Sequence, residues 1–286
     1  MKQNRSRKAN PKPNGPAGER DPILGIDFGG MYREQCRRSS FGPRTSADWD
    51  RRAERRSRGE GGSDYTRAFL KRVDWTGLET ALDVGCGTGN LAVPLARRLR
   101  TVHALDFSPE MLRFLERKRK RARLDNIVTH RLSWTDSWKE VPPADLVVCS
   151  RALAVQDLGR ALRKLHRMAR RRCMVSLHAG GHFLGADVRA LLGRDTAPRP
   201  GYIYAVNLLY QMGVQATVDF IRSVGGLGYE SVEEFLGAVR WRIGSLASAE
   251  EKRLRRFFLN LPPDRDGKRR YRHGFTWALL TWETNP

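Results

Sequence analysis

The sequence predicts an α/β protein whose doubly wound, mostly parallel seven-stranded sheet carries extra N-terminal helices and helical insertions in the C-terminal third. Two observations support this prediction. Short apolar runs alternate with helical segments between residues 81 and 177, and connections of that length require parallel strands joined by right-handed crossovers. A glycine-rich turn also joins the first strand to the first helix of this series, as in sheets that bind a ligand at the carboxyl ends of their strands.

The segment before the sheet predicts a tail and two helices. Residues 1–45 mix Lys, Arg, Asn, Pro and Gly with little apolar periodicity, so we expect a basic, disordered tail that takes no part in the core. A helix is expected to begin at Ser46, and a second at Asp64 after a glycine-rich break.

The sheet and its helices follow in chain order. Seven strands are expected at residues 81–84, 102–105, 127–130, 146–149, 173–177, 218–221 and 275–281. Helices are expected at residues 90–99, 109–123, 158–169, 231–243 and 248–259. We therefore expect one domain over residues 46–286, with a ligand-binding core at about 78–180, a lid region at about 181–270 and the last strand at about 271–284.

Composition limits the class of protein. A chain of 286 residues with 40% hydrophobic content can bury one good core with appendages. No apolar run approaches the roughly 20 residues of a membrane span, and no signal peptide is evident, so we expect a cytoplasmic protein with no membrane partner. The four cysteines form no CxxC pair, which argues against a metal site. The oligomeric state stays open.

The formal net charge of +22 leaves two interpretations open. An excess of this size favours a polyanionic partner such as RNA. However, Arg far outnumbers Lys, and the basic residues are spread along the whole chain instead of forming one stripe, which is typical of a GC-rich coding sequence.

The glycine spacing indicates the kind of ligand. Residues 82–91, with the sequence LDVGCGTGNL, run from a strand through a glycine-rich turn into a helix. Glycines in such a turn allow tight bending and the close approach of a ligand. Asn90 stands where a dinucleotide-binding GxGxxG turn has its third glycine, and the Lys-Ser/Thr pair of a phosphate-binding loop is missing. The turn therefore favours a ligand without a pyrophosphate group.

A carboxylate follows the second strand. Asp106 lies about twenty residues after the first glycine, the interval at which an acidic side chain can bind ribose hydroxyls. Ser108 and Pro109 are expected to start the next helix, as its N-cap and first-turn residues. The order of these features on a strand-turn-helix-strand frame makes Asp106 the strongest single candidate for ligand binding.

On these motifs, residues 81–177 resemble the core of the class I S-adenosylmethionine-dependent methyltransferases, which have a Rossmann-like fold. The resemblance implies S-adenosylmethionine (SAM) as the cofactor, with its ribose held by Asp106 and its adenine flanked by Phe107 and Met111. It also implies that the methionine part of SAM contacts the first turn, at Asp83, Gly85, Cys86, Gly87 and Gly89.

The adenine side departs from the family pattern. Most members carry an Asp after the third strand that meets the adenine amino group, whereas this chain reads Leu-Ser-Trp-Thr-Asp over residues 132–136. Either Ser133 takes the place of that Asp or Asp136 reaches in, and we assign Ser133 and Trp134 to the adenine side. The resemblance also implies that Ser150, assigned to the cofactor, and Arg151, assigned to the acceptor, face the transferable methyl group.

Candidates for the acceptor side lie beyond the fifth strand. His178 is the candidate general base or acceptor-orienting group, although a merely hydrogen-bonded histidine is the alternative. A metal site shared with His182 is disfavoured by the glycines between them. Tyr204, Asn207 and Tyr210 are candidates to line an acceptor pocket, and their alternative role is ordinary packing of a half-buried helix.

The sequence thus predicts a SAM-dependent methyltransferase that passes its methyl group by in-line displacement to a small-molecule acceptor of unknown identity. The alternative is an RNA or other macromolecular acceptor bound through the basic surface and tail. Neither an Asp/Asn-Pro-Pro-Tyr motif after the fourth strand nor a Pro-Cys nucleophile is present, which argues against base methylation. A non-catalytic binding module is disfavoured because the glycine turn and Asp106 are intact.

Overall fold

The structure is a computed structural model of the 286-residue chain. It describes residues 21–39, 44–57, 63–182, 184–223, 229, 231–265, 269–271 and 274–284.

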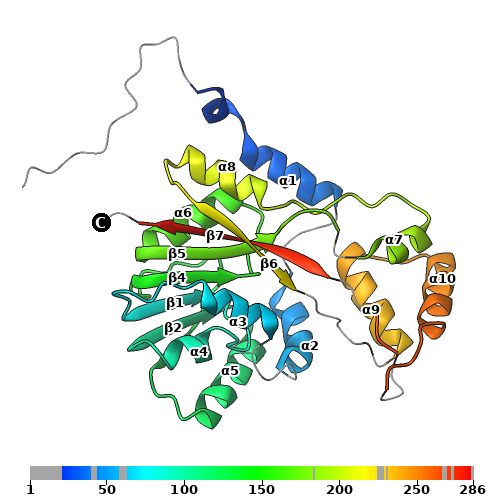
Figure 1. The fold of residues 1–286 in the computed structure, drawn as a ribbon, viewed down its shortest axis with the longest axis horizontal. Coiled ribbons are helices and arrows are strands. Elements are labelled where there is room, and N and C mark those ends of the chain that lie inside the picture. The colour runs from blue at the N-terminus through cyan, green and yellow to red at the C-terminus, as the bar shows by residue number, and fades with distance from the viewer. Residues whose placement is uncertain are drawn as a thin grey trace, which may run out of the picture.

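The centre of the molecule is one seven-stranded sheet with the order β3-β2-β1-β4-β5-β7-β6 (Figure 1). Its strands are β1 (Thr80–Val84), β2 (Thr101–Asp106), β3 (Ile127–Arg131), β4 (Ala144–Ser150), β5 (Ala169–His178), β6 (Thr217–Ser223) and β7 (Phe275–Glu283). Strands β1 to β5 are parallel, whereas β7 runs antiparallel to both β5 and β6. The predicted seven-stranded, mostly parallel sheet is confirmed, and the switch in strand order lies between β1 and β4.

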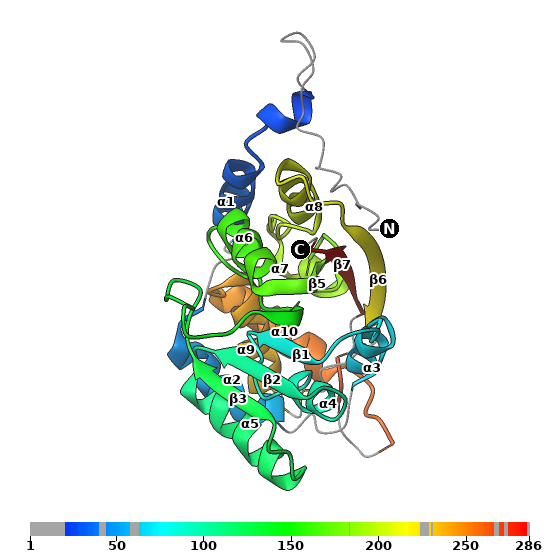
Figure 2. The same cartoon turned by 90° about the vertical axis from the view of Figure 1, so that its left-hand side faces the viewer.

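Helices surround this sheet. They are the 3-10 helix η1 (Pro22–Gly25) and the α-helices α1 (Phe28–Arg38), α2 (Ser46–Ser57), α3 (Asp64–Lys71), α4 (Ala92–Ala96), α5 (Pro109–Arg121), α6 (Leu158–Met168), α7 (Ala186–Leu192), α8 (Ile203–Gln211), α9 (Val232–Ile243) and α10 (Ser248–Leu259). Helices α1, α6 and α8 cover one face of the sheet, and α3, α4 and α5 cover the other (Figure 2). Helices α7, α9 and α10 form a separate group beyond the carboxyl ends of the parallel strands (Figure 1).

Short polar side chains cap the N-termini of four helices that the sequence predicted. Ser63, Ser108, Asp157 and Ser231 each accept a hydrogen bond from the backbone N–H three residues ahead, at the starts of α3, α5, α6 and α9. Such a cap satisfies one of the free N–H groups at a helix N-terminus, and replacing it with Ala typically costs about 1 kcal/mol. The predicted N-cap role of Ser108 is confirmed.

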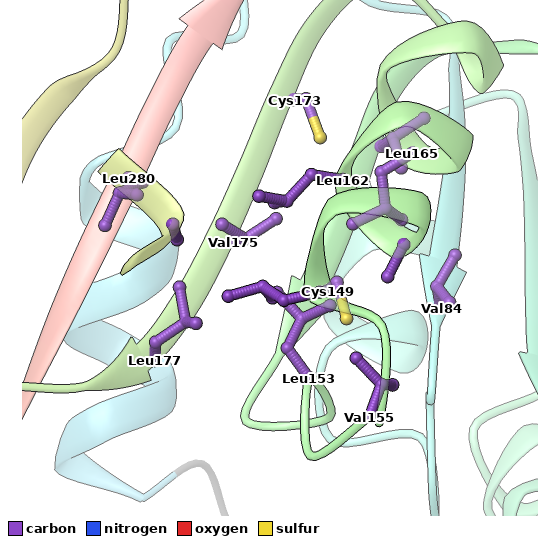
Figure 3. Close-up of a cluster of buried hydrophobic side chains, with 14 of the residues drawn as sticks. Val84, Cys149, Leu153, Val155, Leu162, Leu165, Cys173, Val175, Leu177 and Leu280 are labelled. Atoms are coloured by element: carbon purple, nitrogen blue, oxygen red, sulfur yellow. The ribbon is translucent and has the colours of Figure 1, made fainter. Parts of the chain in front are cut away.

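The core on the α6 side is a continuous apolar layer. Figure 3 shows Leu162 and Leu165 of α6 facing Cys149 of β4 and the β5 residues Cys173 and Val175. All five side chains are fully buried, and burial raises the pKa of both thiols well above the usual value. This layer fixes the position of α6 against the end of β4, where the candidate site begins.

The N-terminal segment differs from its prediction. Residues 28–38, expected to belong to a disordered tail, form α1, and Tyr32 and Cys36 of this helix are buried against α6 and α8. The Tyr32 hydroxyl donates to the carbonyl of Val155 at 2.8 Å. The helix was missed because only one face of it carries apolar residues, within a segment rich in charge and glycine. Residues 1–20 lie outside the described part of the chain.

One helix is shorter than expected. The sequence predicted a helix over residues 90–99, whereas α4 spans only Ala92–Ala96. Pro94 explains the start of the helix, because proline lacks the N–H of the helical ladder and is tolerated only in the first turn. In the described residues, no helix is both long and apolar enough to cross a membrane.

Candidate functional site

The glycine turn lies between β1 and α4, at the carboxyl edge of the sheet. Gly85, Gly87 and Gly89 all have positive φ, at +68°, +54° and +80°. A Cβ on Gly85 would lie 2.3 Å from the Cβ of Ala152, so only glycine lets this turn contact the segment after β4. A Cβ on Gly87 would meet no atom closer than the Met111 sulfur at 3.9 Å, which leaves the space beside this backbone open.

Asp106 ties the ends of the first two strands together. One carboxylate oxygen accepts from Gly87 N at 2.8 Å, and the other accepts from Ser108 N at 3.0 Å. The residue is only 7% exposed and forms part of a cavity wall. Each carboxylate oxygen has two lone pairs, so the group retains acceptor capacity toward a ligand in that cavity.

A cavity of about 400 Å³ opens at the carboxyl ends of β1, β2 and β4, and we call it the main cavity. Its lining includes nine of the predicted site residues: Gly85, Gly87, Asp106, Phe107, Met111, Ser133, Trp134, Ser150 and Arg151. The structure thus brings together the ends of β1, β2 and β4, the loop after β3 and the start of α5, as the sequence predicted.

A second, smaller cavity of about 50 Å³ shares Gly85, Gly87, Ser150 and Arg151 with the main cavity, and we call it the side cavity. Asp83 and Cys86, which were predicted to contact the methionine part of the ligand, line this space. Gly89 lines neither cavity; its missing Cβ makes room for Leu115 of α5, which a methyl group would approach to 2.2 Å.

Asp83 is a buried acid, and one of its carboxyl oxygens accepts no hydrogen bond from the described residues. It is 2% exposed, and its Oδ2 atom has no hydrogen-bond partner among the described residues. Burial, followed by the nearby charge of Asp106, raises the pKa of Asp83 to about 7. A buried carboxyl of this kind favours a cationic or hydrogen-donating ligand group beside it.

Arg151 lies on the wall between the two cavities in a strained backbone conformation. Its φ of +58° is unusual for a residue with a side chain. The guanidinium lies over the ring of Tyr65 at 4.2 Å, and its Nε has no hydrogen-bond partner among the described residues. Burial lowers the pKa of Arg151, although the group stays positively charged at neutral pH. Strain of about 1–3 kcal/mol commonly marks functional sites.

Tyr65 holds the end of β4 and was not identified from the sequence. Its hydroxyl lies 2.9 Å from the Ser150 hydroxyl and 2.5 Å from the Ser176 hydroxyl, and it lines the side cavity. The residue comes from α3, far from the glycine turn in the chain, and an aromatic residue in a short helix gives no local signal of such a role.

Ser133 and Asp136, the two alternatives for the adenine side, have different positions in the loop after β3. Ser133 lines the main cavity, whereas Asp136 does not and instead accepts from Ser133 N at 2.7 Å. Lys164 of α6 closes the loop by donating to the carbonyls of Trp134 and Asp136 at 3.1 and 2.6 Å. Asp136 therefore shapes the loop that presents Ser133 and Trp134.

The structure places His178 outside both the main and the side cavity. It is 8% exposed at the end of β5, its ring packs edge-on against Trp277, and its Nδ1 accepts from Gly180 N at 3.3 Å. This geometry matches the alternative of a hydrogen-bonded histidine.

The predicted acceptor residues of α8 also lie elsewhere. Tyr204 donates to Gln35 Oε1 of α1 at 2.5 Å, and the Tyr210 hydroxyl bonds to Asp21. Asn207 donates to the carbonyl of Ile203 within its own helix. None of the three predicted residues lines the main or the side cavity. The aromatic residues of α8 hold the N-terminal segment, which the sequence analysis had treated as a tail.

Further residues of the main cavity were missed because they come from distant elements. Arg44 and Trp49 reach it from the start of α2, and Gln156, Asp157 and Arg160 from the start of α6. In the described residues, no group of three or more His, Cys, Asp or Glu side chains is placed to hold a metal ion.

Comparison with known proteins agrees with this geometry. Residues 81–172 match a family model described as a methyltransferase domain. An uncharacterized protein of Haemophilus influenzae is 33% identical over 273 residues, which cover 92% of this chain and 98% of that protein.

Solved structures share the fold. A putative sarcosine dimethylglycine methyltransferase of Galdieria sulphuraria aligns with a TM-score of 0.53 and 15% identity, covering 83% of this chain and 98% of that one. Magnesium protoporphyrin IX methyltransferase of Synechocystis, solved with bound S-adenosylhomocysteine (SAH), aligns with a TM-score of 0.50 and 15% identity, covering 91% and 100%. The family model thus identifies residues 81–172 as a methyltransferase domain, and the strand order of the sheet, with the likeness to these structures, shows the Rossmann-like fold of the class I S-adenosylmethionine-dependent methyltransferases.

Proposed function

We propose that this protein transfers the methyl group of SAM to a small-molecule acceptor, and that the main and side cavities together hold the cofactor. The observation that carries the proposal is Asp106, whose carboxylate is fixed by Gly87 N and Ser108 N at the wall of the main cavity. Two backbone bonds orient the carboxylate before any ligand arrives, which lowers the entropic cost of binding vicinal hydroxyls.

The residues present fit the parts of SAM. Asp106 would hold the ribose hydroxyls, while Phe107, Met111, Ser133 and Trp134 would surround the adenine in the apolar part of the main cavity.

In the side cavity, the free oxygen of Asp83 and the free Nε of Arg151 offer an acceptor and a donor. These two groups complement the ammonium and carboxylate of an amino acid.

Bound SAM supplies a methyl group on a sulfonium centre, a carbon that is already activated toward displacement. The chain's own contribution is then alignment and the exclusion of water. Tyr65 fixes the Ser150 hydroxyl, and Ala152 and Val155 give the wall of the main cavity beyond Arg151 an apolar surface.

Two ionisable side chains of α6 that line the main cavity, Asp157 at its N-cap and Lys164, already have partners. Asp157 accepts from Arg160 N at 2.8 Å, and Lys164 holds the loop after β3. We therefore propose that the acceptor enters as a nucleophile and that alignment, instead of proton abstraction, is the main task of the enzyme.

The shape of the site supports a small acceptor. The main cavity falls in the range of about 300–1,000 Å³ that is usual for small-molecule pockets. Helices α7, α9 and α10 lie beyond the carboxyl ends of the strands, the end of the sheet at which the main cavity opens. The two similar solved structures are also named for reactions on small molecules, a glycine derivative and a porphyrin.

Calorimetric titration with SAH tests the cofactor site. We expect saturable binding by the intact protein and a loss of about 100-fold or more in affinity for Asp106→Ala, because two hydrogen bonds to a charged acceptor contribute about 1.5–3 kcal/mol each. Asp125→Ala on the surface serves as the matched control and should bind as the wild type does.

Circular dichroism must show that both variants are folded. An intact protein that binds no SAH, or a folded Asp106→Ala variant with unchanged affinity, would overturn the assignment. Positive binding would be followed by methyl-transfer assays on panels of metabolites and of RNA, and transfer to RNA alone would refute the small-molecule acceptor.

A further inference from the structure

A third cavity, lined by arginines, lies outside the proposed cofactor site. It has a volume of about 90 Å³ and lies where the end of α1, residues 182–199 and the end of α9 meet. We call it the arginine pocket, after the five arginines that line it: Arg38, Arg189, Arg194, Arg199 and Arg242. Asp195 is the one carboxylate among its described lining residues.

Part of this positive charge is not balanced by protein carboxylates. Arg38 pairs with Glu34, and Arg194 pairs with Glu250. In the described part of the chain, Arg189 and Arg242 form no ion pair. Arg242 donates instead to the uncharged oxygens of Ala238 and Tyr229, at 2.8 and 3.4 Å.

Burial and neighbouring positive charges lower the pKa of Arg199. Burial, followed by the charges of Arg242 and Arg44, lowers the pKa of Arg199 to about 10. The Arg199 guanidinium donates to the Arg242 carbonyl at 2.7 Å, in the last turn of α9. A cation at a helix C-terminus is favourable by itself, typically by 0.3–1 kcal/mol. That effect also applies to Arg242, which lies in the same turn and donates to the Ala238 carbonyl, but it leaves Arg189 unexplained.

Arg189 supplies a hydrogen-bond donor without an acceptor. Its Nε is buried and has no hydrogen-bond partner among the described residues. His182 also lines the pocket, and burial together with the charge of Arg189 lowers the pKa of this histidine. A buried unsatisfied donor costs about 1–3 kcal/mol, so the arrangement favours the entry of an acceptor group.

The last turn of α9 links the arginine pocket to the main cavity. Arg44, which lines the main cavity, donates to the carbonyl of Trp241 at 2.7 Å, one residue before the carbonyl that Arg199 binds. Trp49 of the main cavity packs edge-on against Trp241 at 5.5 Å. Residues of the two cavities therefore contact the same turn of α9, which brings the cavities close to each other.

We propose that the arginine pocket binds an anionic group of the methyl acceptor, a carboxylate or a phosphate, while the rest of the acceptor lies toward the main cavity. This inference rests on the proposed function. The pocket is much smaller than the roughly 300 Å³ of a site for a whole metabolite, which suits one functional group. Planar guanidinium groups bind carboxylate and phosphate oxygens through paired hydrogen bonds.

The test uses inorganic phosphate and succinate as probes, titrated calorimetrically into the SAH-saturated protein at constant ionic strength set with chloride. We expect saturable binding of at least one probe, weakened about tenfold or more in both Arg189→Gln and Arg242→Gln, since a hydrogen bond to a charged group contributes about 1.5–3 kcal/mol. Preference for phosphate or succinate identifies the anionic group. Arg113→Gln on α5, a surface arginine paired with Glu110, is the matched control and should bind as the wild type does.

Binding of SAH is measured on the same samples, so that a failure of the proposed function can be distinguished from a failure of the proposed anion site. Wild-type protein that binds no SAH refutes the proposed function. Protein that binds SAH but neither probe, or binds the probes equally well in all variants, refutes the arginine pocket as an anion site.

A measurement on the unmodified chain covers the case in which both pocket variants misfold. Phosphate or succinate should protect Arg189 from modification by phenylglyoxal, as read by mass spectrometry, while Arg113 stays reactive. Equal labelling of Arg189 with and without the probes would overturn the inference.

Discussion

Asp83 lies at the end of β1, lines the side cavity and has a pKa near neutrality. In an unfolded chain its carboxyl ionises near the usual value of 3.8, whereas in the folded protein it holds its proton up to about pH 7. Between these values the folded state binds more protons than the unfolded state, so the free energy of unfolding falls as the pH rises. The full penalty is about 4 kcal/mol above pH 7, from a shift of roughly three pH units.

We therefore expect Asp83→Asn to stabilise the ligand-free protein, with a gain in melting temperature that is larger at pH 8 than at pH 5. The physical reason is that an amide pays no ionisation cost when it is buried. Thermal unfolding followed by circular dichroism at the two pH values measures the effect, with Asp125→Asn on the surface as control. A gain that does not change between pH 5 and pH 8 would contradict the proposed protonation of Asp83.

The residues of the glycine turn could be predicted from the sequence because their geometry is local. A positive φ at Gly85 and a carboxylate at Asp106 follow from spacing along one strand-turn-helix-strand unit. Tyr65 and Arg44 could not be predicted, since their roles come from contacts between distant elements. That His178 packs against Trp277 and lines neither cavity could not be predicted, because the end of a strand defines an edge of the sheet but leaves the direction of the side chain open.

At the scale of elements, α1 has the clearest testable contribution. We expect Tyr32→Phe to lower the free energy of unfolding by about 1–3 kcal/mol, because it removes the bond to the Val155 carbonyl and leaves this buried acceptor unsatisfied. Urea unfolding measures the change. Met31→Ala on the exposed side of the same helix is the control, and we expect a change within about 0.5 kcal/mol.

Because Val155 also lines the main cavity, the affinity of the Tyr32→Phe variant for SAH is measured as well as its stability. A loss of stability no larger than that of the control would mean that α1 is not held by this bond.

The sequence predicted most helices and strands but not how the outer helices pair. The central strands β1 and β4 are mostly apolar and buried along nearly their whole length, a pattern that is strong in the sequence. Helices α1 and α8 are recognisable only through each other, since Tyr204 bonds to Gln35 and packs against Tyr32. An aromatic residue that serves such a contact has the same spacing as one that lines a ligand pocket.

At the scale of the whole molecule, the net charge of +22 makes the small-molecule proposal testable against the RNA alternative. Residues 1–20 hold six basic residues and one acidic residue, and they can be removed without touching α1. We expect this deletion to leave SAH affinity and methyl transfer unchanged, because the described lining of the main and side cavities comes from residues 44–164.

The same deletion removes positive charge, so we expect it to weaken any RNA binding. The logarithm of the affinity should then depend less steeply on the logarithm of the salt concentration. Filter binding over a salt series measures this slope. Loss of methyl transfer on deletion of residues 1–20 would favour the tail-guided macromolecular enzyme.

The position of β7 in the sheet has a consequence for biosynthesis. It is the last strand of the chain, yet it lies between β5 and β6, and within the described residues β6 has no other strand partner. During translation at about 5–20 residues per second, the nascent chain displays the open edges of β5 and β6 for a period on the order of seconds before β7 is made. Open edges of this kind can pair with other chains. Completion of the sheet therefore awaits the synthesis of residues 275–283, and a ribosome that stalls before residue 275 would leave β5 and β6 with open edges.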